Sequence, residues 1–293
     1  MSIVKSFSVG NGDLFYIRHD SDNFTIIDCC LTDDNQESIV SELQREGQSK
    51  GIRRFISTHP DEDHYKGIEY LDEKMPIYNF YCVQNEASKD DETESFKHYR
   101  HLRDGDRAFY VSKGCSRRWM NESSEERGRA GIHIWWPDTS NAEYKDALLD
   151  AKYGIAFNNI SIIAEYCAGN GVKMLWLGDL ETGFMERIEE DISFKPVHVI
   201  FASHHGRASG KIPDSWLDKL KPKIIVIGEA PSRHLHYYGG YNTLTQNRAG
   251  DITVDCADQG KMHIYASNPE YTADFLDDED QYRYDYYIGT LNF

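Results

Sequence analysis

The sequence predicts a single large α/β domain. Short apolar runs typical of strands alternate along most of the chain with segments in which apolar residues recur at helical spacing. The 293 residues are 40% hydrophobic and 13% aromatic, which is enough to bury one large core. This length also accommodates two ordinary domains. We interpret the chain as one domain, because the segment whose composition differs most from the rest resembles an insertion rather than a second domain.

The first part of the chain is rich in expected strands. A breaker-rich turn at residues 10–13 separates the first two apolar runs. Residues 34–48 carry apolar side chains at helical spacing behind an aspartate that can cap a helix. Residues 52–57 predict a buried strand that leads directly into an acidic, histidine-containing loop. The expected strands here are 3–9, 14–18, 24–28, 52–57 and 77–83, and the expected helices are 34–48 and 65–71.

The alternation continues in the later part of the chain, where most expected strands are apolar and closely spaced. This pattern favours further strands of the same domain. The expected strands are 132–136, 161–166, 173–177, 197–202, 224–227, 252–254 and 262–266, and the expected helices are 182–190 and 215–220.

Two segments differ from the rest in composition. Residues 86–95 are acidic and rich in breakers, whereas residues 97–130 carry nine Lys or Arg against five acids. We interpret 86–130 as an insertion or lid within a domain that spans 1–268. Residues 269–293 are acidic and aromatic, which predicts a solvated tail packed on that domain. A protein partner, if there is one, is expected to bind the tail or the basic insertion.

Composition also restricts the class of protein. A net charge of −17 repels polyanions and argues against a general duplex-DNA coating protein. No apolar run approaches the ~20 residues that span a bilayer. The N-terminus lacks the basic and apolar regions of a signal peptide, so we expect a cytoplasmic protein without a membrane partner. The six cysteines are scattered without a CxxC pair, which predicts buried thiols.

The most informative motif is the loop at residues 58–64. It contains His59, Asp61, Asp63 and His64 directly after an apolar strand. In an extended turn, the alternate side chains of His59, Asp61 and Asp63 point to one side. His64 joins them as the next helix begins. Two imidazoles and two carboxylates at a strand end can hold two divalent cations. A solvated surface loop is the alternative, and the pattern alone leaves the two balanced.

Further short motifs follow other expected strands in a fixed order. Alone, the Asn pair predicts a turn and Asp179 a helix cap. In order, the motifs are Val9-Gly10-Asn11-Gly12-Asp13, Ile26-Ile27-Asp28, the 58–64 loop, Asn158-Asn159-Ile160-Ser161-Ile162, Leu177-Gly178-Asp179-Leu180-Glu181 and Ser203-His204-His205-Gly206. Together they resemble the metallo-β-lactamase superfamily. The resemblance is greatest to the branch typified by the hydrolase domain of ComEC, the bacterial DNA-uptake channel, and it extends from about residue 3 to residue 266.

The resemblance implies a fold and a ligand set. The implied fold is an αββα four-layer sandwich, in which two β-sheets face each other, helices cover the outside and the metal site lies at one edge. The implied cofactors are two divalent cations, bridged by Asp179. The implied metal ligands are His59, Asp61, Asp63, His64, Asp179, Asn159, and either His204 or His205.

This chain departs from the superfamily pattern in ways that affect the metal. Asp61 replaces the second histidine of the superfamily signature, as is usual in this branch, and Asn158-Asn159 stand where the third histidine of the first site falls. Oxygen ligands favour manganese or magnesium, with zinc as the alternative. Cys29-Cys30 replace two glycines and no channel domain is present, so we expect a stand-alone relative of the branch.

The resemblance also implies roles in catalysis. A pair of cations activates water and stabilises in-line displacement at phosphorus, and Asp63 is expected to orient that water. His234 and His236 lie where the branch has a histidine-rich loop, and we expect them to donate a proton to the leaving group or to contact the substrate. The expected substrate-binding residues are Asn158, Ser161 and Arg207.

The expected function is therefore metal-dependent hydrolysis of a phosphodiester, with single-stranded nucleic acid as a candidate substrate that the basic 97–130 stretch would steer. The alternative is a small-molecule hydrolase acting on a cyclic nucleotide, phosphoester, thioester or lactone, because an acidic body suits a small substrate better than a long polyanion. A non-catalytic partner-binding module is the third hypothesis. The intact ligand set argues against it.

Overall fold

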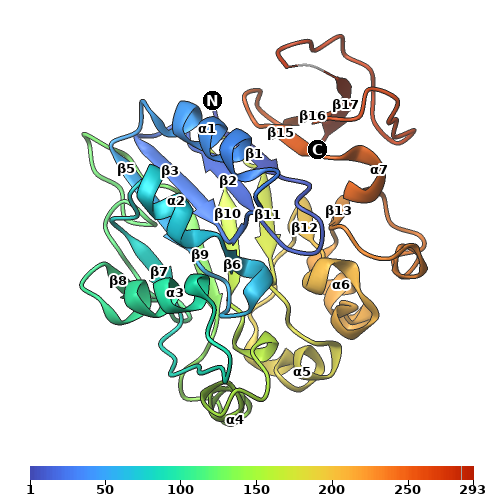
Figure 1. Ribbon diagram of the computed structural model, residues 1–293. Helices are drawn as coiled ribbons and strands as arrows, with labels where there is room; N and C mark the ends of the chain where they lie inside the picture. Colours follow the sequence, from blue (N-terminus) through green and yellow to red (C-terminus); the bar gives the residue numbers. More distant parts are fainter. Residues whose placement is uncertain (285) are drawn as a thin grey trace.

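The computed structural model describes residues 1–284 and 286–293 and has the mixed α/β architecture that the sequence predicts (Figure 1). One sheet has nine strands in the order β17-β16-β15-β1-β2-β3-β5-β7-β8. A second has six strands in the order β14-β13-β12-β11-β10-β9. A small third sheet pairs β4 (Cys29–Cys30) with β6 (Tyr65–Lys66).

The regular elements of the two large sheets are short. The nine-stranded sheet contains β1 (Ile3–Ser6), β2 (Phe15–Arg18), β3 (Asn23–Ile27), β5 (Ile52–Ile56), β7 (Phe80–Cys82), β8 (Ala108–Tyr110), β15 (Ile252–Asp255), β16 (Lys261–Ala266) and β17 (Tyr287–Asn292). The six-stranded sheet contains β9 (Ile132–Trp136), β10 (Ile163–Cys167), β11 (Lys173–Trp176), β12 (Val199–Phe201), β13 (Ile224–Ile227) and β14 (Thr243–Thr245). The α-helices are α1 (Gln36–Gly47), α2 (Ile68–Lys74), α3 (Glu94–Asp104), α4 (Ala142–Lys152), α5 (Thr182–Arg187), α6 (Asp214–Leu220) and α7 (Gln246–Ala249).

Each large sheet contains a run of parallel strands. These are β3, β5, β7 and β8 in the first sheet and β11 to β14 in the second. The carboxyl ends of parallel neighbours meet at one edge of a sheet, so the residues that follow them come close together. Asp28 follows β3 and the 58–64 loop follows β5, while Asp179 follows β11, and His204 and His205 follow β12. Strand direction therefore gathers the predicted motifs.

One hydrophobic core contains side chains from both large sheets. Phe15 of β2 packs edge-on against Trp176 of β11 and Phe201 of β12, with ring centroids 5.9 and 4.9 Å apart. Other side chains of the nine-stranded sheet, such as Tyr16 of β2 and Phe55 of β5, belong to a second core with α1, α2 and α3. Because successive side chains of a strand point to opposite faces, both faces of this part of the nine-stranded sheet are buried. Figure 1 shows these helices against that sheet.

The segment 86–130, whose structure the sequence leaves open, adds to the edge of the nine-stranded sheet. Thr93 caps α3 by accepting a hydrogen bond from Phe96 N at 3.0 Å. Phe96 and Tyr99 are buried among the helices, and β8 pairs in parallel with β7. The segment is therefore packed into the domain through α3 and β8.

The C-terminal segment differs from the solvated tail that its acidic composition predicts. It ends in β17, which pairs antiparallel with β16 as the edge strand of the nine-stranded sheet. Thr290 of this strand is fully buried and forms a 2.6 Å hydrogen bond with Nδ1 of the buried His263. The acidic residues precede the strand, so composition averaged over 269–293 hides a short strand at its end.

Asp72 links α2 to the segment 86–130. Its carboxylate accepts hydrogen bonds from Ile77 N at 2.6 Å, His98 Nε2 at 2.9 Å and Arg107 Nη1 at 3.2 Å. Burial opposes the charge, but these partners outweigh it and lower the pKa of Asp72 below its ordinary value of 3.8. A lowered folded-state pKa contributes stability that is present above the unfolded pKa and is lost as the pH falls through the folded one.

We expect Asp72→Asn to lower the free energy of unfolding by about 1–2 kcal/mol at pH 7. The difference from wild type should shrink as the pH falls below 3.8, because both proteins then carry a neutral group there. Urea unfolding at a series of pH values measures it. Glu73→Gln, next in sequence and paired with the exposed Lys74, is the matched control and should have little effect. Equal destabilisation by Asp72→Asn at every pH would contradict the charge-based account.

Within the described residues, no helix is both long enough and apolar enough to cross a membrane.

Candidate metal centre

Asp28 orients the loop that follows β5. It lies directly after β3, fully buried, with a left-handed φ of 58° that aspartate tolerates better than most residues. Its carboxylate accepts hydrogen bonds from Thr58 N at 2.7 Å, from Thr58 Oγ1 at 2.6 Å and from His64 Nδ1 at 2.9 Å. Because Nδ1 of His64 donates to Asp28, the other ring nitrogen, Nε2, is left to act as a ligand.

The same arrangement extends to His59. The Thr58 hydroxyl donates to Asp28, so its oxygen accepts the hydrogen bond from Nδ1 of His59 at 3.1 Å. Nε2 of His59 is thereby left free and lies 3.9 Å from Oδ2 of Asp179. The rings of His59 and His64 are buried together with centroids 4.1 Å apart. One buried carboxylate therefore fixes the orientation of two imidazoles.

Asp179 enters the site from the six-stranded sheet. The chain leaves β11 through Gly178 at φ 53°, where an added Cβ would lie 2.7 Å from the Ser161 side chain, so only glycine fits. Asp179 N donates to Ser161 Oγ at 3.0 Å. The carboxylate is 2% exposed; Oδ1 lies 3.2 Å from Nε2 of His64, and Oδ2 lies 3.7 Å from Nε2 of His205.

The turn after β12 is strained. His204, His205 and Gly206 adopt left-handed φ values of 51°, 53° and 83° in succession. Such a conformation costs of order 1–3 kcal/mol for each residue that is not glycine, and it persists where the surroundings hold it. Nδ1 of His205 donates to Oδ1 of Asp13 at 3.2 Å, and Nδ1 of His204 is 2.9 Å from Oγ of Ser209. The turn thereby directs the imidazole of His205 toward Asp179.

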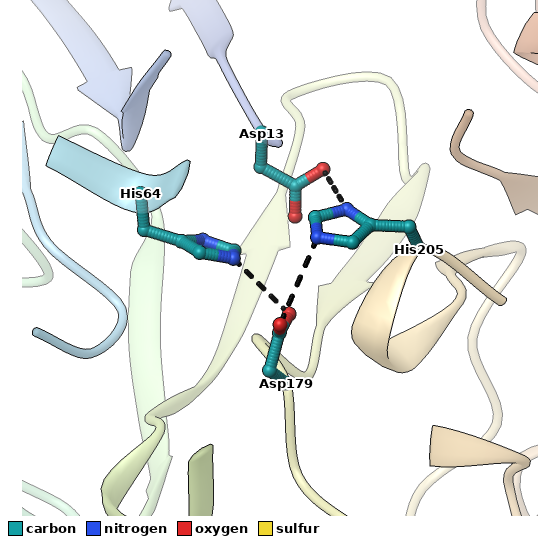
Figure 2. Close-up of side chains that lie close together, drawn as sticks. All are labelled: Asp13, His64, Asp179 and His205. Atoms are coloured by element: carbon teal, nitrogen blue, oxygen red, sulfur yellow. Dashed lines mark hydrogen bonds and ion pairs between the residues drawn. The ribbon is translucent and has the colours of Figure 1, made fainter. Parts of the chain in front are cut away.

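These side chains converge from four separate parts of the chain (Figure 2). One potential ligand atom from each of Asp13, His64, Asp179 and His205 lies within 4.8 Å of all the others. Asp63 adds a carboxylate at the margin of the group, with Oδ2 3.4 Å from Nε2 of His205. Imidazole and carboxylate groups at this spacing are the donors that divalent metal ions use in proteins.

The donor atoms fit a divalent cation. Within the described part of the chain, Nε2 of His59, His64 and His205 and Oδ1 of Asp179 are buried without a hydrogen-bond partner. A buried polar atom without a partner is costly and uncommon in a folded protein. A cation bound between them would satisfy these atoms together, so the residues present could hold a metal ion.

Burial and charge act against each other in this cluster. Burial opposes protonation of His205, but Asp13 and Asp179 outweigh it and raise the pKa to about 10. Burial also opposes ionisation of Asp179, but His64 and His205 outweigh it and hold the pKa well below its usual range. Burial and the neighbouring His64 lower the pKa of His59 to about 4. The imidazoles and carboxylates thus favour each other's charged forms, and a bound cation would take the place of the ring protons.

Asp61, a predicted ligand, does not join the cluster. Its side chain is 38% exposed, and its Oδ1 accepts hydrogen bonds from Glu62 N at 2.9 Å and Lys89 Nζ at 3.1 Å. The cause is local: the three residues Glu62–His64 form a 3-10 turn that Asp61 caps. The loop is therefore not extended throughout, and alternate side chains no longer point to one side.

The Asn pair also lies outside the convergent atoms. Asn158–Ile160 form a 3-10 turn, in which both asparagines are half-buried. Nδ2 of Asn159 donates to Oε2 of Glu181 at 2.9 Å, and Oδ1 of Asn159 accepts from Glu181 N at 3.1 Å. Both polar atoms of this amide are therefore engaged by the residue that precedes α5. Ser161, predicted to bind substrate, is fully buried, and its Oγ accepts the hydrogen bond from the backbone N–H of Asp179.

Arg207 lies at the margin of the centre. Its Nη2 donates to Oδ1 of Asn11, and Nδ2 of Asn11 in turn donates to Oδ2 of Asp63 at 3.3 Å. The predicted position near a substrate anion is compatible with this chain of contacts.

The loop that carries His234 and His236 is more open. His236 is exposed, and its ring lies over Tyr237 with centroids 4.6 Å apart. Nδ1 of His234 is 3.1 Å from the Tyr237 hydroxyl. Slight desolvation and the positive charges of Arg233 and Arg207 lower the pKa of His234. A neutral ring at pH 7 favours substrate contact over proton donation for this residue.

Three residues of the centre were not predicted as such from the sequence. Asp13 and Asp28 orient His205 and His64, and Lys89 engages Asp61. Acids that follow a turn or a strand are common, so their position in the sequence predicts only turns or caps. Nothing about Lys89 in the sequence distinguishes it from other lysines of the 86–130 segment.

Comparison with known proteins adds little to this geometry. No protein-family model and no curated protein matches the chain. Among solved structures, the chain is similar to the crystal structure of DIM-1 metallo-beta-lactamase, with a TM-score of 0.32 and 17% sequence identity over 60% of this chain. The match spans 64% of the length of that structure. The site is therefore interpreted from its own geometry.

Proposed function

We propose that this protein is a metal-dependent hydrolase of the metallo-β-lactamase type and that its substrate is a phosphodiester. The observation that carries the proposal is the set of buried, unpartnered donor atoms on His59, His64, His205 and Asp179. The proposal includes an αββα arrangement of layers, which is supported by the core common to both sheets and by the packing of α1 to α3 on the nine-stranded sheet. It includes manganese or magnesium as the favoured metal and zinc as the alternative.

In this proposal, His64, Asp179 and His205 hold a divalent cation, with His59 and Asp63 beside them. When bound, such a cation supplies Lewis-acid activation of water and of the scissile phosphoryl group. Burial opposes ionisation of Asp63, but the neighbouring imidazoles of His205, 3.4 Å away, and His64 outweigh it and lower its pKa to about 2. The ionised Asp63 carboxylate is therefore available at neutral pH to accept a hydrogen bond from the attacking water and orient it.

Two residues at the margin would bind the substrate. The guanidinium of Arg207 presents several N–H donors in one plane, which suits a phosphoryl oxygen pair. His234, neutral near pH 7 because slight desolvation and neighbouring arginines lower its pKa, would contact the leaving part of the substrate by a hydrogen bond. Arg207 would not need to move far, since it already reaches Asn11, which donates to Asp63.

A small substrate is the second candidate, and one observation favours it over nucleic acid. Most of the basic side chains in 97–130 pair with carboxylates of this protein, which neutralises the positive field that would steer a polyanion. The paired residues are Lys97, Arg100, Arg103, Arg107 and Arg127, with Glu94, Glu92, Asp104, Asp72 and Asp22 respectively. A short or cyclic phosphodiester depends less on such steering than a long strand does.

The test is a substrate panel with and without Mn²⁺, Mg²⁺ and Zn²⁺. It contains labelled single-stranded DNA and RNA, a cyclic nucleotide, a generic chromogenic phosphodiester, a thioester and a lactone. We expect cleavage of phosphodiesters that requires added cation and stops with a chelator. Hydrolysis of only the thioester or lactone would contradict the phosphodiester assignment, and absence of both metal binding and hydrolysis would favour a non-catalytic module.

Arg207→Ala is expected to raise KM for the generic phosphodiester about tenfold or more, with a smaller change in kcat, because a charge-assisted contact made with bound substrate is lost. Lys97→Ala removes a cation from the surface of α3, where it pairs with Glu94, and is the matched control. Equal KM values for the two variants would show that Arg207 does not bind substrate.

A further inference from the structure

Lys89 is held beside Asp61 by more than one interaction. Its side chain is only 17% exposed, and Nζ lies 3.1 Å from Oδ1 of Asp61 and 4.0 Å from Oε2 of Glu62. The ammonium also lies over the rings of Tyr65 and Phe157, 5.2 and 4.8 Å from their centroids. Aromatic faces attract a cation, most strongly where water is partly excluded. Lys89 is therefore a fixed positive charge rather than a mobile surface lysine.

The residues around Lys89 are themselves fixed. The Tyr65 hydroxyl donates to Oε2 of Glu62 at 2.8 Å, and the Thr93 hydroxyl donates to both oxygens of Glu62 at 3.0 and 3.1 Å. Glu62 is thus held next to the ammonium by Thr93, which caps α3, and by Tyr65 of β6, and its backbone N–H donates to Oδ1 of Asp61 at 2.9 Å. The Lys89–Asp61 pair belongs to this network, which gives it a defined geometry.

This pairing makes the centre asymmetric. His64, Asp179, His205 and Asp63 form a group with two imidazoles and two carboxylates. A cation on the His59 side could be bound by the imidazole of His59 and by the Asp179 carboxylate, which it would share with the other cation. The carboxylate of Asp61 is already paired with Lys89.

Among the described residues, no other neighbouring group replaces Asp61 as a negatively charged ligand on the His59 side. The Asn159 amide is engaged by Glu181 through both of its polar atoms. His204 Nε2 lies 3.8 Å from Oδ2 of Asp179 and adds a neutral ligand at most. Affinity for hard divalent cations rises with the number of carboxylate ligands. The His59 side therefore lacks a carboxylate of its own.

We propose that the Lys89 ammonium competes with a second divalent cation for Asp61, so that the protein binds one cation tightly, at His64, Asp179 and His205, and a second one only weakly. This inference rests on the proposed function solely in that the centre binds metal. Neutralising Lys89 releases Asp61 as a ligand and strengthens the second binding step.

The experiment is a calorimetric titration of the metal-free protein with Mn²⁺ alone, together with the count of ions retained after dialysis. Wild type should retain close to one ion per chain and show a second, weaker step. Lys89→Met keeps the length and apolar packing of the side chain but removes its charge. It should lower the dissociation constant of the second step about tenfold or more, whereas Lys89→Arg should leave that step weak.

Further variants attribute the effect to Asp61. Asp61→Asn should leave the tight step of wild type unchanged within about twofold, because Asp61 is not among its ligands. In the Lys89→Met background, Asp61→Asn should reverse the gain in the second step. Lys97→Met, which removes an exposed cation paired with Glu94, is the control for charge alone and should change neither step.

Two equally tight ions in wild type, or a second step that Lys89→Met leaves unchanged, would overturn the inference while leaving the proposed function intact. Should Lys89→Met fail to fold, Mn²⁺ binding by the Asp61→Asn variant tests the inference instead. Loss of the tight binding step in that variant would show that Asp61 is a ligand of the tight site and would contradict the inference. Binding of no ion by wild type would instead overturn the proposed function itself.

Discussion

Asp179→Asn is expected to cause the largest loss of function of any single substitution in this protein. Asp179 is buried and lies within 4 Å of the ring nitrogens of His59, His64, His204 and His205, so it is common to every part of the centre. Removal of residues that merely orient metal ligands costs about 10–100-fold in affinity or activity. Loss of this carboxylate should cost more than ~100-fold in both.

Ion content after dialysis and kcat with added Mn²⁺ measure the effect. The isosteric amide preserves packing, so circular dichroism should remain that of wild type. Asp214→Asn, at an exposed aspartate of α6 that pairs with Lys211, is the matched control and should retain both metal and activity. An Asp179→Asn protein that holds as much metal as wild type would place the cation elsewhere.

Asp28→Ala is expected to have the largest effect on stability. The substitution leaves Nδ1 of His64, together with the amide and hydroxyl of Thr58, buried without their acceptor. Breaking a buried charged pair on one side typically costs about 3–5 kcal/mol, and we expect a loss in this range from chemical denaturation of the metal-free protein. Metal affinity should also fall about 10–100-fold, because the imidazole of His64 is no longer held in orientation.

Two variants separate these effects. Thr58→Val removes one hydroxyl but keeps the Asp28–His64 bond, so it should cost less, about 1–2 kcal/mol, and affect metal affinity less. Asp33→Ala, at an exposed residue shortly after β4, should change neither quantity. If the free energy of unfolding of Asp28→Ala equalled that of wild type, the buried carboxylate would not be needed to hold the 58–64 loop.

Much of the sheet framework was predictable from local pattern. The runs at 52–57, 173–177, 197–202 and 224–227 are rich in apolar residues, and they form β5, β11, β12 and β13 within a residue or two. The helices α3 and α4 were not predicted, because their polar faces and the charges around them hide the apolar positions. β17 was not predicted, because the acidic residues that precede it dominate the composition of the last 25 residues.

The site was predictable in part. Histidines and aspartates at strand ends identify His59, His64, Asp179 and His205, which the structure brings together. What pattern cannot supply is the partner of each polar atom. The spacing of Asp61 matches that of a ligand, yet a single 3-10 turn and one lysine from a distant segment direct it elsewhere. Such contacts depend on tertiary packing and leave no trace in local sequence.

The cluster in Figure 2 also has a consequence for how the chain folds. Asp13 and His205, which share a hydrogen bond, are separated by 192 positions, and the two imidazoles flanking Asp179 lie in turns that follow strands of different sheets. Contacts between residues so far apart form late and slow folding. Cation uptake should thus report completion of the whole domain, and neither sheet alone should bind metal. A cation present at about 100 times its dissociation constant would then stabilise the finished protein by about 2.7 kcal/mol and leave early folding steps unchanged.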